Sequence, residues 1–534
     1  MTIKQAREKL KDIFQAILKS DDRNVHVLKV ATGLGKTELC TELRNVLLAL
    51  PNHSLKDEVC KRMKVEYRPT PSLNSLPADV RKRLEYLYSI GANFEANRYL
   101  AEKAKVDNSC QEYLKDCHVC YLSNETIITT HQRALFIDWL HETIIFDEDV
   151  VTSLLPTGKV TISDLIRLEA NLNNEHDQRT ISHLINEIRQ GRVNTPRKME
   201  SIIFKDFQSI EYEVLSSNVK YNSNILHFFE SDFFVVDAND VATIHYIRKY
   251  ELPESKKIII LSATANEEIY RNLVGDRLRF YDISNVEPVG IIEQNTKYSC
   301  SKSSLAKHID YILEQVKDMP VITFAEYKDL FSNPIEDMHY GKTTGFDILK
   351  GKDIAVVGTP HVSPITIALY ASILKISIRS HDYVQQGYYP IRQQQVISNG
   401  FRFWFNAYDN EELRNLQFYF IESELKQAVG RPRVNTEPVS VKLYSNYPLP
   451  EACINDEEIQ IGRQKLERNK ASLAISNKSD SYFEKLLFED LNLEILHNDE
   501  LGNMKLNVFL YSALFAGTGT MMTMMQIIKG ASKN

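Results

Sequence analysis

The sequence predicts an α/β protein with two domains, each built on a parallel sheet covered by helices. Short β-branched apolar runs alternate with helix-forming stretches in two separate blocks, one beginning at residue 25 and the other near residue 290. A glycine-rich turn joins the first of these runs to a helix-forming stretch. The chain has 534 residues, which is too long for a single hydrophobic core. These three observations together favour a multidomain α/β architecture.

The first block, residues 1–285, is predicted to form the first domain. Apolar residues at helical spacing predict an opening helix over 3–18. Buried strands are then predicted at VHVLKV, NVLLAL, ETIITT, ETIIF and KKIIIL. Two stretches interrupt this pattern: residues 57–124, which carry charges, prolines and four of the seven cysteines, and residues 151–255, which are polar and mainly helical in pattern. Both are interpreted as insertions.

The second block, residues 286–445, is predicted to form the second domain. Its strands are expected at PVITFAEY, DIAVVGTP and VSVKLYSN, and ESELKQAVGRPR is expected to be a helix that ends in a basic turn. Residues 446–534 are predicted to form a helical C-terminal region. Its apolar, methionine-rich segment, 515–528, suits the groove of a protein partner.

Composition excludes some classes of protein. The formal net charge is −7, which argues against a protein that coats polyanions but is compatible with a local nucleic-acid groove. No run reaches about 18 uncharged apolar residues, so neither a membrane span nor a membrane partner is expected. An odd number of cysteines, with no apolar core of the signal-peptide type, favours reduced thiols and a cytoplasmic location.

The segment ATGLGKT, residues 31–37, has the context of a phosphate-binding loop, because it follows a strand and opens a helix. Glycines let backbone N–H groups curl around phosphate, and the helix N-terminus adds partial positive charge. Lys36 is expected to reach the β- and γ-phosphates and Thr37 to bind Mg²⁺. ATP and Mg²⁺ are therefore the predicted cofactors. The residues expected to bind the nucleotide in this loop are Thr32, Gly33, Leu34, Gly35, Lys36 and Thr37.

A second predicted catalytic element is the acidic end of the strand at 144–149. Asp147 is expected to hold Mg²⁺ through its water shell, and Glu148 to polarise the attacking water. Phosphoryl transfer depends mainly on positioning and on charge stabilisation, which such carboxylates supply. Together with Lys36 they predict an ATP hydrolase.

Two further segments resemble motifs of superfamily 2 helicases. Ser262-Ala263-Thr264 resembles motif III, and the segment 427–433, QAVGRPR, resembles motif VI. The resemblance implies two RecA-like domains, with Ser262 and Thr264 coupling the ATP site to the nucleic acid. It also implies that Gln427 senses phosphate or orients water, and that arginines of the second domain close over the γ-phosphate. The spacing departs from the family, which favours Arg431, or Arg431 together with Arg433.

Two loops stand where this family contacts the nucleic-acid backbone. The first contains Pro51 and His53, and the second contains Thr130 and His131. Hydroxyl groups and helix N-termini are suitable phosphate donors. The alternative for each loop is an ordinary polar strand end.

Within the superfamily, the chain resembles the XPD/DinG helicases over roughly residues 25–445. Gly345-Phe346-Asp347, followed by Gly351 and AVVGTP, resembles motif V, which places Gly345 and Asp347 at the nucleotide. The segment TTH before the acidic strand is similar to that family's TNH. The insertions fall where the family carries a Cys-bearing domain and an Arch domain. The acidic strand ends in DEDV rather than the family's DEAH, which leaves the coupling between motifs open.

The resemblance also implies a metal. Cysteines of this family bind a [4Fe–4S] cluster, and the candidates here are Cys60, Cys110, Cys117 and Cys120. Four thiolates also suit zinc, for which His118 is an additional candidate ligand, and free thiols without a metal are the third alternative.

The leading interpretation is an ATP-dependent DNA helicase that moves 5′ to 3′ on single-stranded or forked DNA, associated with the nucleoid. RNA is not excluded as its track. One alternative is a metal-free superfamily 2 motor that acts on RNA or within a replication or defence complex. Another is a nucleic-acid-binding assembly module with a regulatory ATPase, whose C-terminal region binds protein partners.

Overall fold

A computed structural model describes residues 1–199, 204, 207–216, 221, 223–336, 338–343, 348–376 and 391–454. They divide into two compact units: the first holds the described residues of 1–393 and 406–453, and the second holds residues 394–405 and residue 454. Nearly all of the expected C-terminal region, including segment 515–528, lies outside the described residues. No helix of the described chain has both the length and the hydropathy to cross a membrane.

Helices occupy much of the first unit, and most begin with a side-chain cap. Thr2, for example, closes a reciprocal capping box with Gln5 at the start of the opening helix. The helices are α1 (Ile3–Lys19), α2 (Lys36–Cys40), α3 (His53–Arg62), α4 (Ala78–Ile90), α5 (Asn93–Lys103), α6 (Asn108–Leu122), α7 (His131–Phe136), α8 (Val151–Leu154), α9 (Ile162–Asn171), α10 (Glu175–Gln190), α11 (Phe207–Ser216), α12 (Ile225–Phe229), α13 (Glu267–Val274), α14 (Ile309–Val316), α15 (Pro364–Ile373) and α16 (Glu411–Val429).

A seven-stranded parallel sheet forms the first lobe, in the order β11-β1-β10-β5-β2-β4-β3. Its strands are β1 (Val25–Val30), β2 (Leu47–Leu50), β3 (Tyr67–Pro69), β4 (Thr126–Thr130), β5 (Thr143–Asp147), β10 (Lys257–Ser262) and β11 (Leu278–Ile283). Alternate side chains enter two different cores: Val27 packs with α13 on one face, whereas Leu28 packs with α1 on the other. Burial on both faces explains the continuous apolar runs in the sequence.

The second lobe is a five-stranded sheet in the order β13-β14-β17-β12-β18, and its pairs from β13 to β12 are parallel. The strands are β12 (Ile291–Asn295), β13 (Val321–Ile322), β14 (Ile354–Val357), β17 (Ser440–Tyr444) and β18 (Cys453–Ile454). An α/β fold with two parallel sheets, as predicted, is therefore confirmed. A separate two-stranded sheet pairs β15 (Ile391–Ser398) with β16 (Phe401–Tyr408).

The two insertions share one hydrophobic core, which the sequence did not suggest. Side chains of α4, α5 and α6 from the first insertion pack with those of α9, α10 and α12 from the second. The second insertion also contains a four-stranded antiparallel sheet, β6-β9-β8-β7. Its strands are β6 (Thr157–Thr161), β7 (Arg197–Lys198), β8 (Phe233–Val236) and β9 (Thr243–Ile247). The prediction of a mainly helical second insertion was therefore incomplete, because short, mixed runs such as TGKVT gave no clear period.

The boundaries of the first insertion also differ from those predicted. Helix α3 and strand β3 lie within 57–124 in part or whole, yet β3 extends the edge of the seven-stranded sheet beside β4. The segment outside the sheet runs from about residue 73 to residue 122. Charged and proline-containing sequence hid a short edge strand, because edge strands tolerate both.

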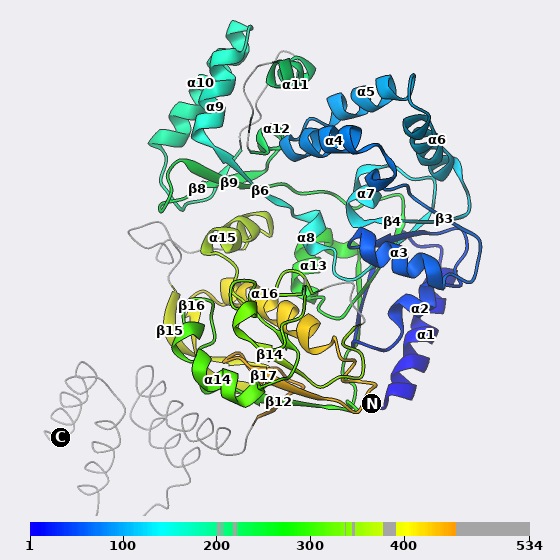
Figure 1. Cartoon of the computed structure of the whole chain (residues 1–534), viewed down its shortest axis with the longest axis vertical. Coiled ribbons are helices and arrows are strands. Elements are labelled where there is room, and N and C mark those ends of the chain that lie inside the picture. The colour runs from blue at the N-terminus through cyan, green and yellow to red at the C-terminus, as the bar shows by residue number, and fades with distance from the viewer. Residues whose placement is uncertain are drawn as a thin grey trace, which may run out of the picture. The chain divides into compact units, whose positions relative to one another are not determined.

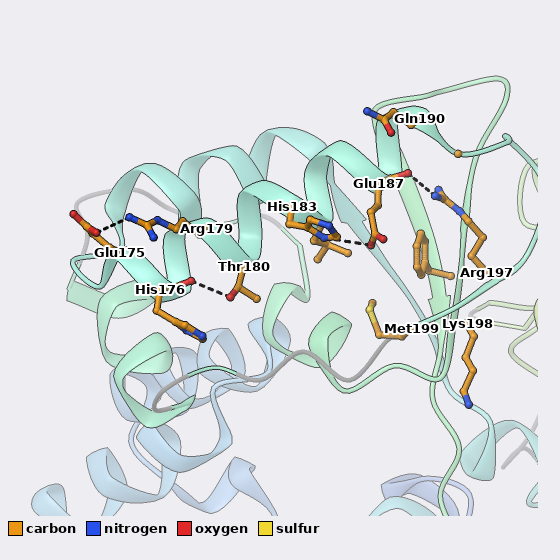
Figure 2. A pocket seen from close by; sticks show the side chains of 13 residues that line it. Glu175, His176, Arg179, Thr180, His183, Glu187, Gln190, Arg197, Lys198 and Met199 are labelled. Carbon is orange, nitrogen blue, oxygen red and sulfur yellow. Dashed lines mark hydrogen bonds and ion pairs between the residues drawn. The ribbon is translucent and has the colours of Figure 1, made fainter.

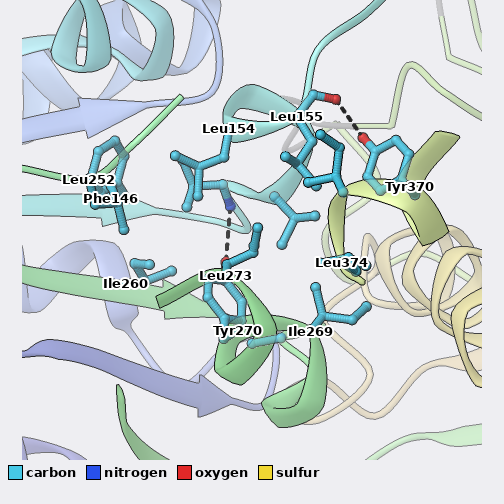
Figure 3. Close-up of a cluster of buried hydrophobic side chains, with 14 of the residues drawn as sticks. Phe146, Leu154, Leu155, Leu252, Ile260, Ile269, Tyr270, Leu273, Tyr370 and Leu374 are labelled. Atoms are coloured by element: carbon cyan, nitrogen blue, oxygen red, sulfur yellow. Dashed lines mark hydrogen bonds between the residues drawn. The ribbon is translucent and has the colours of Figure 1, made fainter. Parts of the chain in front are cut away.

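Helix α15 of the second lobe packs against strands β8 and β9 of the insertion and against α16 (Figure 1). It is apolar on nearly all sides, as expected for a helix surrounded by protein. The Tyr370 hydroxyl donates a hydrogen bond to the backbone oxygen of Leu155, at 2.9 Å (Figure 3). The insertion therefore contacts the second lobe as well as the first.

Candidate nucleotide site

The turn between β1 and α2 has the backbone of a phosphate-binding loop. Gly33 and Gly35 have φ of 81° and 91°, in the left-handed region that favours glycine. Gly35 caps α2 without a side chain, so the first N–H groups of the helix have no side-chain partner there. Lys36 opens the helix and its side chain is buried. A buried cation beside free N–H groups suits a bound anion.

The carboxylate of Asp147 lies next to this loop, at the end of β5. The Thr37 hydroxyl donates a hydrogen bond to Asp147 Oδ2 at 2.7 Å, while the buried Oδ1 has no hydrogen-bond partner in the described chain. Burial, and next the charge of Glu148, raise the pKa of Asp147 to about 6. Mg²⁺ prefers oxygen ligands of this kind, and the unpartnered oxygen fits such an ion.

Glu148 follows in a strained backbone conformation, with φ of 74°. Its N–H donates a hydrogen bond to the oxygen of Leu261 on β10, which fixes the turn. The carboxylate Oε2 lies 3.6 Å from Nζ of Lys36. The strain directs this carboxylate toward the phosphate loop instead of along the strand direction.

The basic turn after α16 lies directly on the phosphate loop. Asn435 Nδ2 donates hydrogen bonds to the backbone oxygen and the hydroxyl of Thr32, at 2.9 and 3.0 Å. A Cβ atom on Gly430 would lie 2.8 Å from Cγ2 of Thr32, so only glycine allows this approach. The Gln427 side chain accepts a hydrogen bond from the Thr343 hydroxyl at 3.1 Å.

One cavity of about 110 Å³ collects these side chains from both lobes. The structure brings together in it most of the predicted nucleotide and catalytic residues. Its lining residues are Thr32, Gly33, Gly35, Lys36, Thr37, Glu38, Leu55, Glu58, Arg62, Asp147, Glu148, Gln427, Gly430, Arg431 and Arg433. Leu34 is buried in the core beneath the loop, and it does not line the cavity. Gly345 and Asp347 fall outside the described residues.

Asp149 links the acidic strand end to three other elements. Its Oδ2 accepts hydrogen bonds from the hydroxyls of Ser262 and Thr264, both at 3.4 Å. Its Oδ1 accepts one from Tyr270 on α13 at 2.8 Å. Burial, and next the charge of Asp149, raise the pKa of Tyr419 on α16. Burial raises the pKa of Asp149. Tyr270 also accepts a hydrogen bond from the backbone N–H of Val150 (Figure 3).

One predicted nucleic-acid contact, His131, is enclosed by protein. His131 is 1% exposed, and its Nε2 lies 2.9 Å from the backbone oxygen of Asp147. Burial lowers its pKa to about 4, so the ring is neutral and supports the acidic strand end from inside. Ser262 and Thr264 are likewise buried. A buried His131 does not present its ring to a nucleic acid. Ser262 and Thr264, which the sequence predicted as coupling residues, bond to the Asp149 carboxylate.

The other predicted contacts lie at helix starts. Thr130 caps α7 through a hydrogen bond from the Arg133 N–H at 3.4 Å, and Asn52 caps α3, which begins at His53. Pro51, after β2, is partly exposed, and His53, the first residue of α3, is exposed. Burial lowers the pKa of His53.

The four candidate cysteines do not form a metal site. Cys110 and Cys117 pack in the insertion core, Cys120 in the core above the seven-stranded sheet, and Cys60 beside the core under α1. No group of three or more His, Cys, Asp or Glu side chains in the described chain is arranged to hold a metal. The expected four-thiolate arrangement does not fit this structure, because α6 directs its cysteines into two different cores.

A second cavity, of about 1030 Å³, lies on the insertion between α10 and the β7–β8 strands (Figure 2). Arg179 pairs there with Glu175 at 2.9 Å, and Nδ1 of His183 lies 3.8 Å from Oε2 of Glu187. Arg197 donates a hydrogen bond to the backbone oxygen of Glu187 at 2.6 Å. The predicted site residues all lie elsewhere.

No protein-family model matches the chain, and no curated protein matches it. A solved structure described as "XPD_Helicase" is 15% identical, covers 83% of this chain and 95% of its own, and has a TM-score of 0.49. One described as "XPD_APO" is 15% identical, with coverages of 82% and 96% and a TM-score of 0.46. A yeast DEAD-box splicing factor is 11% identical, with coverages of 89% and 82% and a TM-score of 0.18. Values this low leave the function to be argued from the site itself.

Proposed function

We propose that this chain is an ATP hydrolase that works as a nucleic-acid motor. The observation that carries the proposal is the single cavity that combines a phosphate loop, an unpartnered buried carboxylate oxygen and two arginines of the second lobe. A phosphate-binding loop alone would indicate nucleotide binding. The added carboxylates and arginines are what phosphoryl transfer to water requires.

The residues divide the work of hydrolysis. The glycine-rich turn and Lys36 bind the phosphates, while Thr37 and Asp147 hold Mg²⁺. The ion, when bound, neutralises charge that develops on the phosphate oxygens. Glu148 orients and polarises the attacking water. Arg431 and Arg433 supply positive charge from the opposite lobe. Gln427, on α16, contacts the phosphate or orients the water, so α16 can respond to the state of the nucleotide.

Coupling to mechanical work is supported by the contacts of Asp149. Its carboxylate joins the acidic strand end to the strand end at Ser262 and to α16 of the second lobe. A change at the phosphate is thereby transmitted to both lobes, as in a cleft that closes on ATP and reopens after hydrolysis. Single-stranded DNA, with movement 5′ to 3′, is the track implied by the XPD/DinG resemblance.

One observation favours the metal-free alternative within the motor class. The cysteines lie in separate cores, which removes the main sequence argument for an iron–sulfur helicase. A superfamily 2 motor without a cluster, acting on DNA or on RNA, is therefore the second candidate.

The test is ATP hydrolysis by the full chain, alone and with single-stranded DNA or RNA oligonucleotides. Lys36→Ala should lower the rate by about 10²- to 10³-fold, because a positioned charge is lost from the transition state. Lys11→Ala, an exposed lysine on α1, is the control. Stimulation by DNA or by RNA identifies the track. Full activity of Lys36→Ala would refute the site, and hydrolysis indifferent to both oligonucleotides would favour a regulatory ATPase.

A further inference from the structure

Arg62 is a cavity residue that no sequence motif indicated. It is the last residue of α3, and it lines the nucleotide cavity together with Leu55 and Glu58 of the same helix. These three residues follow one another at helical spacing, so α3 presents one face to the cavity. Arg62 therefore brings a guanidinium to the cavity from the first lobe.

Two carboxylates hold this guanidinium. Nη2 of Arg62 lies 3.1 Å from Glu38 Oε2, and Nη1 lies 3.3 Å from Glu58 Oε1. Glu38 is the residue after Thr37, so the ion pair ties α3 to the helix that the phosphate loop opens. The Arg62 side chain is 37% exposed, which leaves it accessible to a ligand in the cavity.

The charges of the cavity are balanced before a nucleotide enters. Its cations are Lys36, Arg62, Arg431 and Arg433, and its carboxylates are Glu38, Glu58, Asp147 and Glu148. An incoming polyphosphate needs cations that can leave their carboxylate partners. A guanidinium suits this exchange, because its fork binds phosphate with two parallel hydrogen bonds.

We propose that Arg62 is a phosphate-binding residue of the first lobe, which leaves Glu58 to bind the terminal phosphate of ATP. This inference rests on the proposed ATPase function. Thr37, Asp147 and Glu148 line the same cavity, and they are the residues that would hold Mg²⁺ and position the attacking water. Arg431 and Arg433 reach the nucleotide from the second lobe. Arg62, like Lys36, belongs to the lobe that carries the loop, so it recognises ATP whether or not the lobes are closed.

The experiment compares the affinity of the full chain for Mg²⁺–ATP and for Mg²⁺–ADP by titration calorimetry. Arg62→Ala should weaken ATP binding about tenfold or more, the usual size for a lost charge-assisted hydrogen bond, and ADP binding much less. The affinity of Arg62→Lys for ATP should lie between those of the unchanged protein and Arg62→Ala, since a single ammonium charge replaces the two parallel donors of the guanidinium. Lys64→Ala is the matched control, because Lys64 also pairs with Glu38, at 2.7 Å, but does not line the cavity.

A second variant tests the exchange itself. Glu58→Gln removes the competing carboxylate and should strengthen ATP binding, and this gain should disappear when Arg62 is also replaced by alanine. Equal losses for ATP and ADP, or an Arg62→Ala variant that matches Lys64→Ala, would overturn the assignment. Lys36→Ala in the same titration separates the two proposals: if it also binds ATP normally, the nucleotide site itself is wrong.

Discussion

The nucleotide cavity and the cysteine-bearing segments differ in how the chain brings their side chains together. At the carboxyl ends of β1 and β5, Lys36, Thr37 and Asp147 line one cavity. Of the cysteines, Cys60 lies on α3 and Cys120 on α6, in two different cores. The sequence predicted both a nucleotide site and a cysteine ligand set from short patterns. Only the nucleotide site uses residues that directly follow strands, so local secondary structure places them.

The difference teaches when spacing in a sequence is informative. A strand that runs into a glycine turn and a helix fixes the direction of its first helical side chain within a few residues. Adjacent parallel strands then bring their carboxyl ends to the same edge, as β1, β10 and β5 do here. Cysteines on separate helices have no such constraint, and tertiary packing decides where each thiol lies.

The largest effect that can test this comparison is the pH dependence of Mg²⁺–ATP binding. Asp147 must be ionised to hold Mg²⁺, and its pKa is raised to about 6 by burial and by Glu148. Affinity should therefore be constant above about pH 7 and fall up to tenfold per pH unit below about 6. Titration between pH 5 and 8 measures this slope. A profile without an inflection near 6 would contradict the proposed role of Asp147.

Asp147→Asn is the control, since its affinity for Mg²⁺–ATP should be low and independent of pH over this range.

The raised pKa of Asp147 also predicts how the stability of the nucleotide-free protein depends on pH. Because the folded carboxyl keeps its proton above the ordinary pKa of 3.8, the contribution of Asp147 to the free energy of unfolding should decrease as pH rises from about 4 to 6. Urea unfolding of the two proteins at these pH values measures the difference.

An intermediate effect is expected at the contact between the lobes. Tyr419→Phe removes a hydroxyl of the second lobe whose pKa is raised by burial and next by the charge of the Asp149 carboxylate. The second lobe should then engage the acidic strand end less often. We expect kcat to fall several-fold while the KM for ATP changes little, because the residues of the phosphate loop are intact.

Tyr370→Phe is the matched control for Tyr419→Phe. Tyr370 also belongs to the second lobe, but it donates to the backbone oxygen of Leu155 and not to the carboxylate. Its loss should reduce stability by about 0.5–1.5 kcal/mol and leave kcat unchanged. If both variants lower kcat alike, the effect belongs to lobe packing and Asp149 has no special part in it.

Most of the candidate site was predictable from the sequence, because its residues follow apolar strands. Five residues of the loop at 31–37, the acidic pair at 147–148 and three residues of the basic turn at 430–433 line the cavity. Leu34 does not line it, because its apolar side chain turns into the core. The alternation of strands and helices likewise predicted both parallel sheets.

The remaining features depend on contacts between segments far apart in the chain. Arg62 of α3 lines the cavity and pairs with Glu38 of α2. A lone arginine at a helix end gives no signal of such a contact. His131 follows a polar strand end, yet its ring is buried against Asp147. The shared core of the two insertions joins residues more than 100 positions apart, which neither insertion reveals alone.

The smallest expected effect on catalysis concerns the cysteines. Cys120→Ala should destabilise the protein by about 1–2 kcal/mol, as the loss of one buried atom does, and leave ATP hydrolysis unchanged. Cys300 is a buried cysteine of the second lobe, and Cys300→Ala should have the same effect, because each thiol packs in a core and donates one weak bond to a backbone oxygen. Thermal unfolding and iron content of protein purified without oxygen are the measurements. About four irons per chain, lost in Cys120→Ala but retained in Cys300→Ala, would show that α6 rearranges to bring its thiols to one cluster. Metal binding would then determine how this segment packs.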